Sequence, residues 1–166
     1  MSTFFERYNF GTAAEKTVFG DLEDRGWTVE PGPRHYFSPG LNQVLNDWED
    51  CHSAPCYLRW SPDWIVWRPD SSVPSKNLFA VDVKSGGYNI ERRALLTYQD
   101  CWATKLNIPV IVVFEVNGNR LASSPGKLAL NTLPRLGSDA GSGTPYYAID
   151  PSKLSPLERW FGAKKP

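Results

Sequence analysis

The sequence lacks several features that would place the chain in a specialised class of proteins. None of its apolar runs approaches the length that spans a bilayer, and its first residues show no secretory pattern. It has only three cysteines, an odd number, which without a secretory pattern predicts a protein of a reducing cytoplasm with no membrane partner. It also lacks net charge, because 18 basic residues balance 18 acidic ones. This balance counts against nucleic-acid binding unless the charges are segregated on the surface.

Core-forming residues, by contrast, are abundant. The hydrophobic fraction is 41%, with seven Trp, seven Tyr and eight Phe, which is enough for one domain over residues 1–166. From Gly118 onward glycine, proline and serine become frequent, so 118–166 is predicted to be rich in loops. Within it we expect a strand at 146–149 and a short helix at 155–161 with Ser155 as its N-cap.

The hydrophobic pattern predicts both helices and strands. Helices are expected at 11–25, 41–48 and 90–106, and strands at 64–67, 78–84 and 110–116. Asn89 is the expected N-cap of the third helix, and Asn117-Gly118 is a strong turn signal after the last of these strands. The order of these elements predicts an α/β fold, a mixed central sheet flanked by helices.

Two aspartates and a lysine mark the two central strands. Asp63 directly precedes the first of these strands. The second strand contains Asp82 and, two residues later, Lys84. Because side chains alternate along a strand, Asp82 and Lys84 lie on one face, where burying them unpaired would be costly. One interpretation is an ordinary Asp–Lys pair at a strand end. The chemical alternative is that the two carboxylates converge on a hard divalent cation such as magnesium, which prefers oxygen ligands.

The full motif is more specific than a lone Asp-x-Lys. It consists of Pro62-Asp63, a turn-rich connection, then Asp82-Val83-Lys84 followed by Ser-Gly-Gly. This order resembles the PD-(D/E)XK nuclease superfamily, most of all the archaeal-type Holliday junction resolvases and similar small phage nucleases, over residues 8–116. The resemblance implies a restriction-endonuclease-like core and the activity of a magnesium-dependent endodeoxyribonuclease. It also implies that the protein acts in the cytoplasm of a bacterial, archaeal or phage-infected host cell. It also implies branched recombination intermediates of DNA as substrates, and a homodimer.

The resemblance assigns roles to the motif residues. Asp63, Asp82 and the Val83 carbonyl would bind Mg²⁺, for which Mn²⁺ could substitute. Lys84 would position the attacking water or stabilise the phosphate charge.

Two further residues, Glu15 and Gln99, are predicted site residues. Resolvase-like nucleases carry a glutamate in their first helix that approaches the metal, and Glu15 stands at that place. Thr12-Ala-Ala-Glu15 also fits a capping box, so the residues alone favour a structural role for Glu15. Gln99 resembles the helix glutamine of RecB-type members, although Ala103 stands where an aromatic residue is expected.

Basic residues around the expected metal site are the candidates for binding DNA. They are Arg7, Lys16, Arg92 and Arg93. Arginines in the positions of Arg92 and Arg93 more often mark the solvated first turn of a helix than a phosphate contact.

Residues 31–60 are interpreted as an insertion that shapes substrate choice. They contain Cys51, His52 and Cys56, side chains of the kinds that bind zinc. Their spacing matches no zinc motif, so free buried cysteines are the preferred interpretation.

Alternatives to a resolvase-like activity stay open at this stage. Another activity of the same superfamily, such as restriction, end-processing or transposon-end cleavage, is the alternative, because the loops that set substrate choice carry no readable pattern. A non-cleaving DNA-binding module is less favoured, because all four signature side chains are present.

Overall fold

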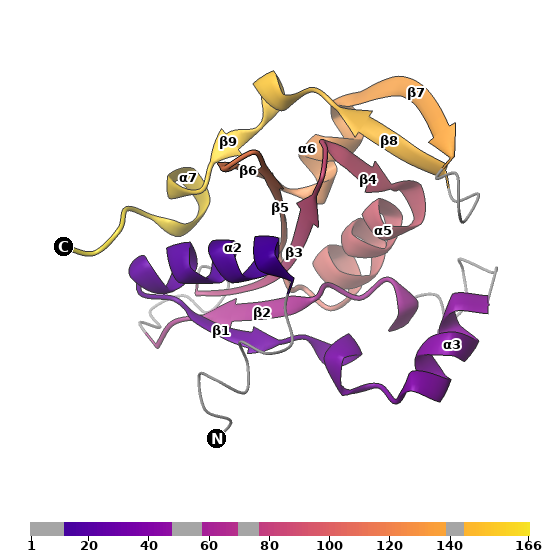
Figure 1. The fold of residues 1–166 in the computed structure, drawn as a ribbon, viewed down its shortest axis with the longest axis horizontal. Helices are drawn as coiled ribbons and strands as arrows, with labels where there is room; N and C mark the ends of the chain where they lie inside the picture. Colours follow the sequence, from indigo (N-terminus) through magenta and orange to yellow (C-terminus); the bar gives the residue numbers. More distant parts are fainter. Residues whose placement is uncertain (1–11, 48–57, 70–76, 139–144) are drawn as a thin grey trace.

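A mixed β-sheet with helices on both faces forms the centre of the fold (Figure 1). The structure, a computed structural model, describes residues 12–47, 58–69, 77–138 and 145–166. Across these residues the strands form a six-stranded sheet in the order β1-β2-β3-β5-β6-β9 and a smaller, three-stranded sheet in the order β4-β8-β7. The strands are β1 (Thr28–Pro31), β2 (Trp64–Trp67), β3 (Leu78–Ser85), β4 (Asn89–Glu91), β5 (Val110–Val116), β6 (Asn119–Ser123), β7 (Thr132–Ser138), β8 (Pro145–Ile149) and β9 (Ser155–Pro156). The helices are α2 (Ala13–Asp24), α3 (Pro39–Asp47), α5 (Arg92–Thr97), the π-helix η3 (Tyr98–Lys105), α6 (Pro125–Leu130) and α7 (Glu158–Phe161), with short 3-10 turns η1 (Pro33–Tyr36) and η4 (Pro151–Lys153).

The larger sheet combines a meander with a parallel pair. Strands β1, β2 and β3 are antiparallel neighbours, whereas β3 and β5 run parallel. Parallel neighbours need a crossover connection, and β4, α5 and η3 lie between them in the chain. Strand β5 turns into β6 at Asn117 and Gly118, whose φ values of 52° and 80° fit a two-residue hairpin turn. The predicted turn is therefore confirmed.

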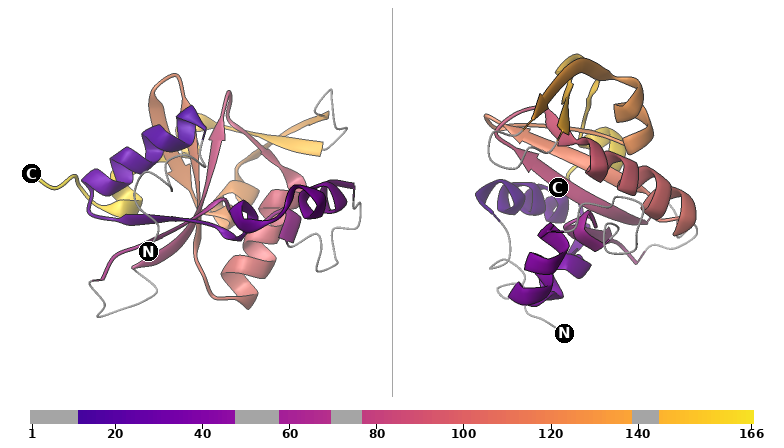
Figure 2. Two further views of the ribbon diagram at one scale, coloured as in Figure 1. Left: turned by 60° about the horizontal axis from the view of Figure 1, so that its bottom comes forward. Right: turned by 90° about the vertical axis from the view of Figure 1, so that its right-hand side faces the viewer.

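Helices cover both faces of the larger sheet (Figure 2). Alternation along the strands places one hydrophobic core on each of these faces. Val81 and Val113 pack in the core that includes α2. Ala80 and Val112 pack in the core that includes α5 and η3. Asp82 follows Ala80 by two residues, so its side chain projects toward the α5 core, which is the arrangement predicted from the strand pattern.

The first helix forms as predicted, together with its cap. Helix α2 begins after Thr12, whose hydroxyl accepts the Glu15 N–H at 3.3 Å, while the Glu15 carboxylate accepts the Thr12 N–H. This reciprocal pair is a capping box, and it satisfies two backbone N–H groups that the helix itself leaves unpaired. Val18 and Leu22 are fully buried on the inner face of α2.

The prediction of one α-helix over 90–106 is wrong at its start, and its second half is a different type of helix. Residues 89–91 form β4, which pairs with β8, so Asn89 is a strand residue and α5 begins only at Arg92. The buried Ile90 is held by a strand that comes much later in the chain, an interaction that local capping preferences do not reveal. The second half is the π-helix η3. None of the helices in the described part of the chain has both the length and the hydrophobicity needed to cross a bilayer.

The C-terminal part is more regular than its composition predicts. The expected loops contain β6, α6, β7 and η4 as well as the predicted strand, which is observed as β8. Ser155 is not a helix cap, because Ser155–Pro156 pairs with β6 as strand β9 and the last helix begins at Glu158. The buried Leu157 draws this segment onto the sheet, where the edge of β6 offers backbone partners.

Candidate active site

The hairpin of β2 and β3 brings the two motif aspartates together. The strand register places Trp64 opposite Val81, so Asp63 lies opposite Asp82, one step further along the pair. Both carboxylates belong to the same face of the sheet by alternation. Asp82 is only 1% exposed, whereas Asp63 is half-buried. The pairing predicted from the motif is thus set by the register of one hairpin.

Close backbone packing holds Asp63 in place. The Gly32 N–H donates to the Asp63 carbonyl at 2.6 Å. A Cβ on Gly32 would lie 2.5 Å from the Pro62 carbonyl oxygen, which no real side chain tolerates. Glycine is therefore required at residue 32 for the chain after β1 to approach the motif. From η1, His35 packs its ring on Trp64, with ring centroids 4.5 Å apart.

The two carboxyl groups cannot both be ionised cheaply. Burial and then the neighbouring Asp82 raise the pKa of Asp63 to about 8, although Lys84 acts in the opposite direction. Oδ2 of Asp82 is buried, and no hydrogen-bond donor among the described residues is assigned to it. Lys84 Nζ lies 3.1 Å from this oxygen as its ion-pair partner. A buried anionic oxygen of this kind is suited to a cation.

Lys84 is held between two carboxylates. Its Nζ lies 3.1 Å from Asp82 Oδ2 and 3.2 Å from Glu91 Oε2. Burial by itself would lower the pKa of Lys84, but the surrounding carboxylates outweigh it, Asp82 foremost, and the pKa lies above its ordinary value. Lys84 is therefore a charged ammonium group at neutral pH, a donor of hydrogen bonds and not a base.

Tyr98 completes the polar group from the helical side. It is the first residue of η3 and only 2% exposed. Burial raises the pKa of Tyr98 well above its ordinary value, and the charges of Asp82 and Asp63 and a hydrogen bond to Asp82 raise it further. The phenol consequently stays protonated and can donate to the Asp82 carboxylate.

The sequence analysis singled out neither Glu91 nor Tyr98 as a site residue. Glu91 lies in a segment that was predicted as helix, so its position against Lys84 could not be foreseen. Tyr98 offered one signal, because a residue with a polar tip in an otherwise apolar stripe usually finds a partner when buried.

Glu15 forms the predicted capping box and lies close enough to influence the site. One of its carboxylate oxygens accepts the Thr12 N–H, and Oε1 accepts the indole N–H of Trp64 at 2.9 Å. Its negative charge contributes to the raised pKa of Asp63. The capping role of Glu15 is therefore observed, and its role toward a metal stays a prediction.

Gln99 lines a cavity in which the site carboxylates take no part. It lines an apolar cavity of about 300 Å³ together with Phe79, Pro109, Pro125 and Trp160, and neither Asp63 nor Asp82 lines this cavity. The catalytic role of Gln99 stays a prediction.

The remaining predicted residues have varied positions. Val83 lies between the two charged residues of β3, with its side chain packed in the α2 core. Lys16 follows Glu15 on α2, and Arg92 and Arg93 begin α5 directly after Glu91. Arg7 and the residues weighed for zinc, Cys51, His52 and Cys56, lie outside the described residues.

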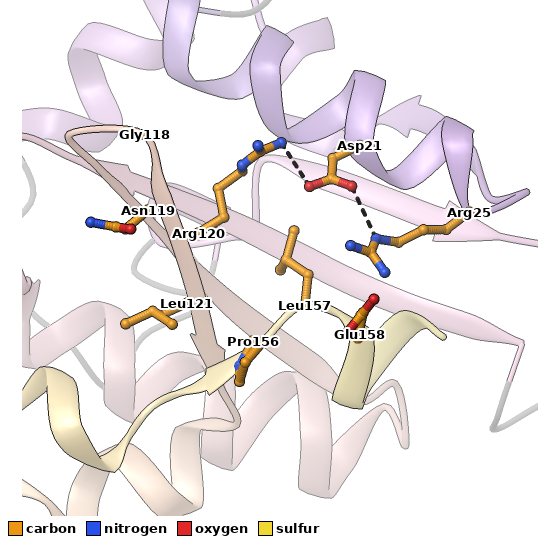
Figure 3. Close-up of a pocket in the computed structure, with 9 residues that line it drawn as sticks. All are labelled: Asp21, Arg25, Gly118, Asn119, Arg120, Leu121, Pro156, Leu157 and Glu158. Carbon is orange, nitrogen blue, oxygen red and sulfur yellow. Dashed lines mark hydrogen bonds and ion pairs between the residues drawn. The ribbon is translucent and has the colours of Figure 1, made fainter. Parts of the chain in front are cut away.

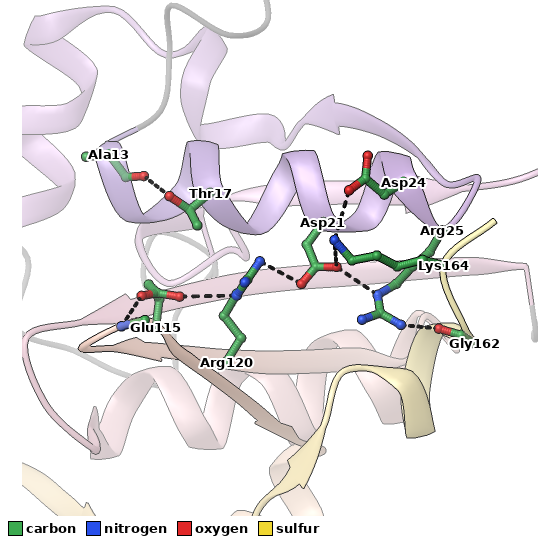
Figure 4. Close-up of polar contacts among 10 residues, drawn as sticks. Ala13, Thr17, Asp21, Asp24, Arg25, Glu115, Arg120, Gly162 and Lys164 are labelled. Carbon is green, nitrogen blue, oxygen red and sulfur yellow. Dashed lines mark hydrogen bonds and ion pairs between the residues drawn. The ribbon is translucent and has the colours of Figure 1, made fainter. Parts of the chain in front are cut away.

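A second buried carboxylate, Asp21, has a different environment. It contacts Arg25 Nε at 3.0 Å, Arg120 Nη1 at 2.7 Å and Lys164 Nζ at 3.3 Å (Figure 4). Asp21, Arg25 and Arg120 line one side of a cavity of about 320 Å³, and Glu158 lines it from α7 (Figure 3). This network ties the C-terminal residues to α2 and β6.

Comparison with known proteins shows the fold. No family model and no curated protein matches the sequence. Similar solved structures include Hjc of Archaeoglobus fulgidus, a Holliday junction resolvase from an archaeal hyperthermophile, with a TM-score of 0.54 and 10% identity over 90% of this chain and 98% of that one. A nuclease from a fusselovirus has a TM-score of 0.46 and 16% identity over 95% of this chain and 89% of that one. The likeness to Hjc confirms the α/β fold that the resemblance to archaeal-type resolvases implied.

Proposed function

We propose that the protein is a metal-dependent nuclease that hydrolyses phosphodiester bonds in DNA. The observation that carries this proposal is the pairing of Asp63 with the buried Asp82 on one hairpin, with the charged Lys84 two residues further on. The fold shared with a Holliday junction resolvase supports it.

The residues present fit a magnesium ion. Asp82 has a buried oxygen without a hydrogen-bond donor in the described part of the chain. Asp63 lies beside it, and a cation bound there would lower its raised pKa. Asp63, Asp82 and the Val83 carbonyl would hold the ion, with Glu15 assisting. Within the described ranges no group of three or more His, Cys, Asp or Glu side chains converges as a metal site. Mg²⁺ needs only a few ligands from the protein, because it usually keeps several of its waters.

The chain's own residues then have distinct tasks. A bound divalent metal would supply Lewis-acid stabilisation of the phosphate and a more acidic water. Lys84, as an ammonium group, would donate to a phosphate oxygen and stabilise the negative charge that grows in the transition state. Tyr98 would orient the Asp82 carboxylate through its hydrogen bond.

We infer further that the preferred substrate is branched DNA, cut by a homodimer. The fold likeness to Hjc supports this narrower proposal. Symmetric cleavage of two strands at a junction requires two active sites, which a homodimer provides.

The test is cleavage of a panel of labelled DNA substrates, namely single strand, duplex, flap and four-way junction, with Mg²⁺ or Mn²⁺. We expect cleavage that is strongest on the junction and that is lost in EDTA. Asp82→Asn is the matched inactive control, and Lys84→Ala should cleave orders of magnitude more slowly than the wild-type protein. Full activity in EDTA, or cleavage that survives in Asp82→Asn, would contradict the proposed site.

A further inference from the structure

Glu91 occupies an unusual position for a glutamate. It is the last residue of β4 and the N-cap residue of α5, with φ −65° and ψ 135°. Glutamate is not among the preferred N-cap residues, and the side chain of Glu91 makes no capping hydrogen bond. Its carboxylate instead reaches across to β3, where Oε2 lies 3.2 Å from Lys84 Nζ.

The smaller sheet fixes the backbone of Glu91. Glu91 pairs with Tyr146 of β8, and the preceding Ile90 is 1% exposed in the α5 core. The Ile149 N–H donates to the Tyr88 carbonyl at 2.8 Å and extends this connection. The start of α5 constrains Glu91 from its other side. Its carboxylate is therefore presented to Lys84 by a rigid frame, and not by a mobile loop.

Lys84 needs an anionic partner other than Asp82 once Asp82 binds the metal. Asp82 also interacts with Asp63 and Tyr98. It is moreover one of the residues proposed to hold the metal, and an oxygen engaged by a metal attracts an ammonium group less strongly. Among the described residues, Asp82 and Glu91 are the carboxylates within 4.0 Å of Lys84 Nζ. Glu91 is thus the partner that remains when Asp82 is engaged.

We propose that Glu91 is a positioning residue, which holds the Lys84 ammonium group at the cleavage site while Asp82 serves the metal. This inference rests on the proposed nuclease function and deepens it. It also gives the smaller sheet a task, because β4 and β8 set the place of Glu91.

The kinetic test is single-turnover cleavage of the DNA that the wild-type protein cuts best. Glu91→Gln keeps the size of the side chain and removes its charge. We expect the rate constant to fall by about 10- to 100-fold, the range typical of residues that orient a catalytic group. Affinity for the same DNA in EDTA should change by less than about twofold, since the role lies in the transition state. In Lys84→Ala, adding Glu91→Gln should cause little further loss.

The matched control is Asp100→Asn. Asp100 is an exposed carboxylate on η3, and its replacement removes the same charge close by in the sequence. This control should cleave at the wild-type rate. Equal losses in Asp100→Asn and Glu91→Gln would show a general charge effect and overturn the proposal.

A second readout does not depend on cleavage. In the metal-free protein, Glu91→Gln should lower the midpoint of chemical denaturation in the wild-type background and have little effect in Lys84→Ala. Additive effects in this cycle would overturn the pairing itself. Wild-type cleavage by Glu91→Gln would overturn the positioning role and leave the proposed nuclease standing. If the wild-type protein cuts no DNA, the nuclease proposal fails, and the cycle still decides whether Glu91 holds Lys84.

Discussion

Two buried aspartates, Asp21 and Asp82, are similar in exposure and opposite in environment. Asp21 has three cationic partners, Arg25, Arg120 and Lys164, at 2.7–3.3 Å. In the described part of the chain, Asp82 has one cationic partner, Lys84, and a second carboxyl group, Asp63, beside it.

The difference separates a structural charge from a functional one. A buried carboxylate that serves only stability is compensated by its own protein, because an uncompensated one would cost several kcal/mol. The Asp21 network is compensated in this way and fastens the C-terminal residues to α2. The Asp82 group is deficient in positive charge, which suits a ligand that brings it.

The largest effect on cleavage is expected from a substitution at Asp82, whose surroundings lack positive charge. Asp82→Asn keeps the shape of the side chain but removes the anionic oxygen, so cleavage should fall by on the order of 10³-fold or more. The protein should stay folded, because mutual repulsion with Asp63 is removed at the same time. Single-turnover cleavage and circular dichroism together check this expectation. A variant that retains more than a tenth of the activity would argue against a metal at Asp82.

Asp21→Asn is the opposite case, with a loss of stability and not of chemistry. It leaves the buried Arg25 and the neighbouring Arg120 without their shared carboxylate. We expect the free energy of unfolding to fall by about 3 kcal/mol, as when one member of a buried ion pair is removed. Denaturant titration measures this, and cleavage assayed below the transition should be unchanged. Loss of activity in the folded Asp21→Asn variant would contradict the separation of a structural Asp21 network from a functional Asp82 group.

The pH dependence of stability should also separate them. The pKa of Asp63 is about 8 in the folded protein, against about 4 in an unfolded chain. Between these values the folded state keeps a proton that the unfolded state releases, so this contribution to stability is full below about pH 4 and is lost as pH rises toward 8. Asp63→Asn cannot titrate and should stabilise the metal-free protein at pH 8, by about 2 kcal/mol after allowance for solvent at a half-buried group.

Denaturation of the wild-type protein and Asp63→Asn at pH 5 and pH 8, in EDTA, checks this sign. Added Mg²⁺ should reduce the advantage of the variant at pH 8, because the cation relieves the repulsion in the wild-type protein. An advantage that is larger at pH 5 than at pH 8 would contradict the assignment.

The smallest effect on stability is expected at Glu15, which has an observed structural role as a helix cap and a predicted role at the metal site. Glutamine can make the same capping hydrogen bond, so Glu15→Gln should change stability by about 1 kcal/mol or less. If Glu15 also assists the metal, the variant should cleave poorly at limiting Mg²⁺ and recover in part with Mn²⁺. Thr12→Ala is the matched control, which removes the cap oxygen and should lower stability while sparing cleavage. Wild-type cleavage by Glu15→Gln would restrict Glu15 to its observed structural role.

Patterns that depend on near neighbours in the chain were predictable. The capping box of Thr12 and Glu15, the turn at Asn117 and Gly118, and the common face of Asp82 and Lys84 all follow from the periodicity of helices and strands. The hairpin of the motif was also predictable, because its two strands are close in sequence.

By itself, then, the sequence determined the motif, the α/β fold class and the candidate carboxylates, since each depends on residue type and local spacing. Only the tertiary structure decided that 89–91 is a strand, that 155–156 joins the edge of β6, and that Gln99 lines an apolar cavity. It also decided that Glu91 meets Lys84. The physical reason is that backbone hydrogen bonds and buried charges are satisfied by whichever partner the fold brings near, and here that partner comes from a distant part of the chain.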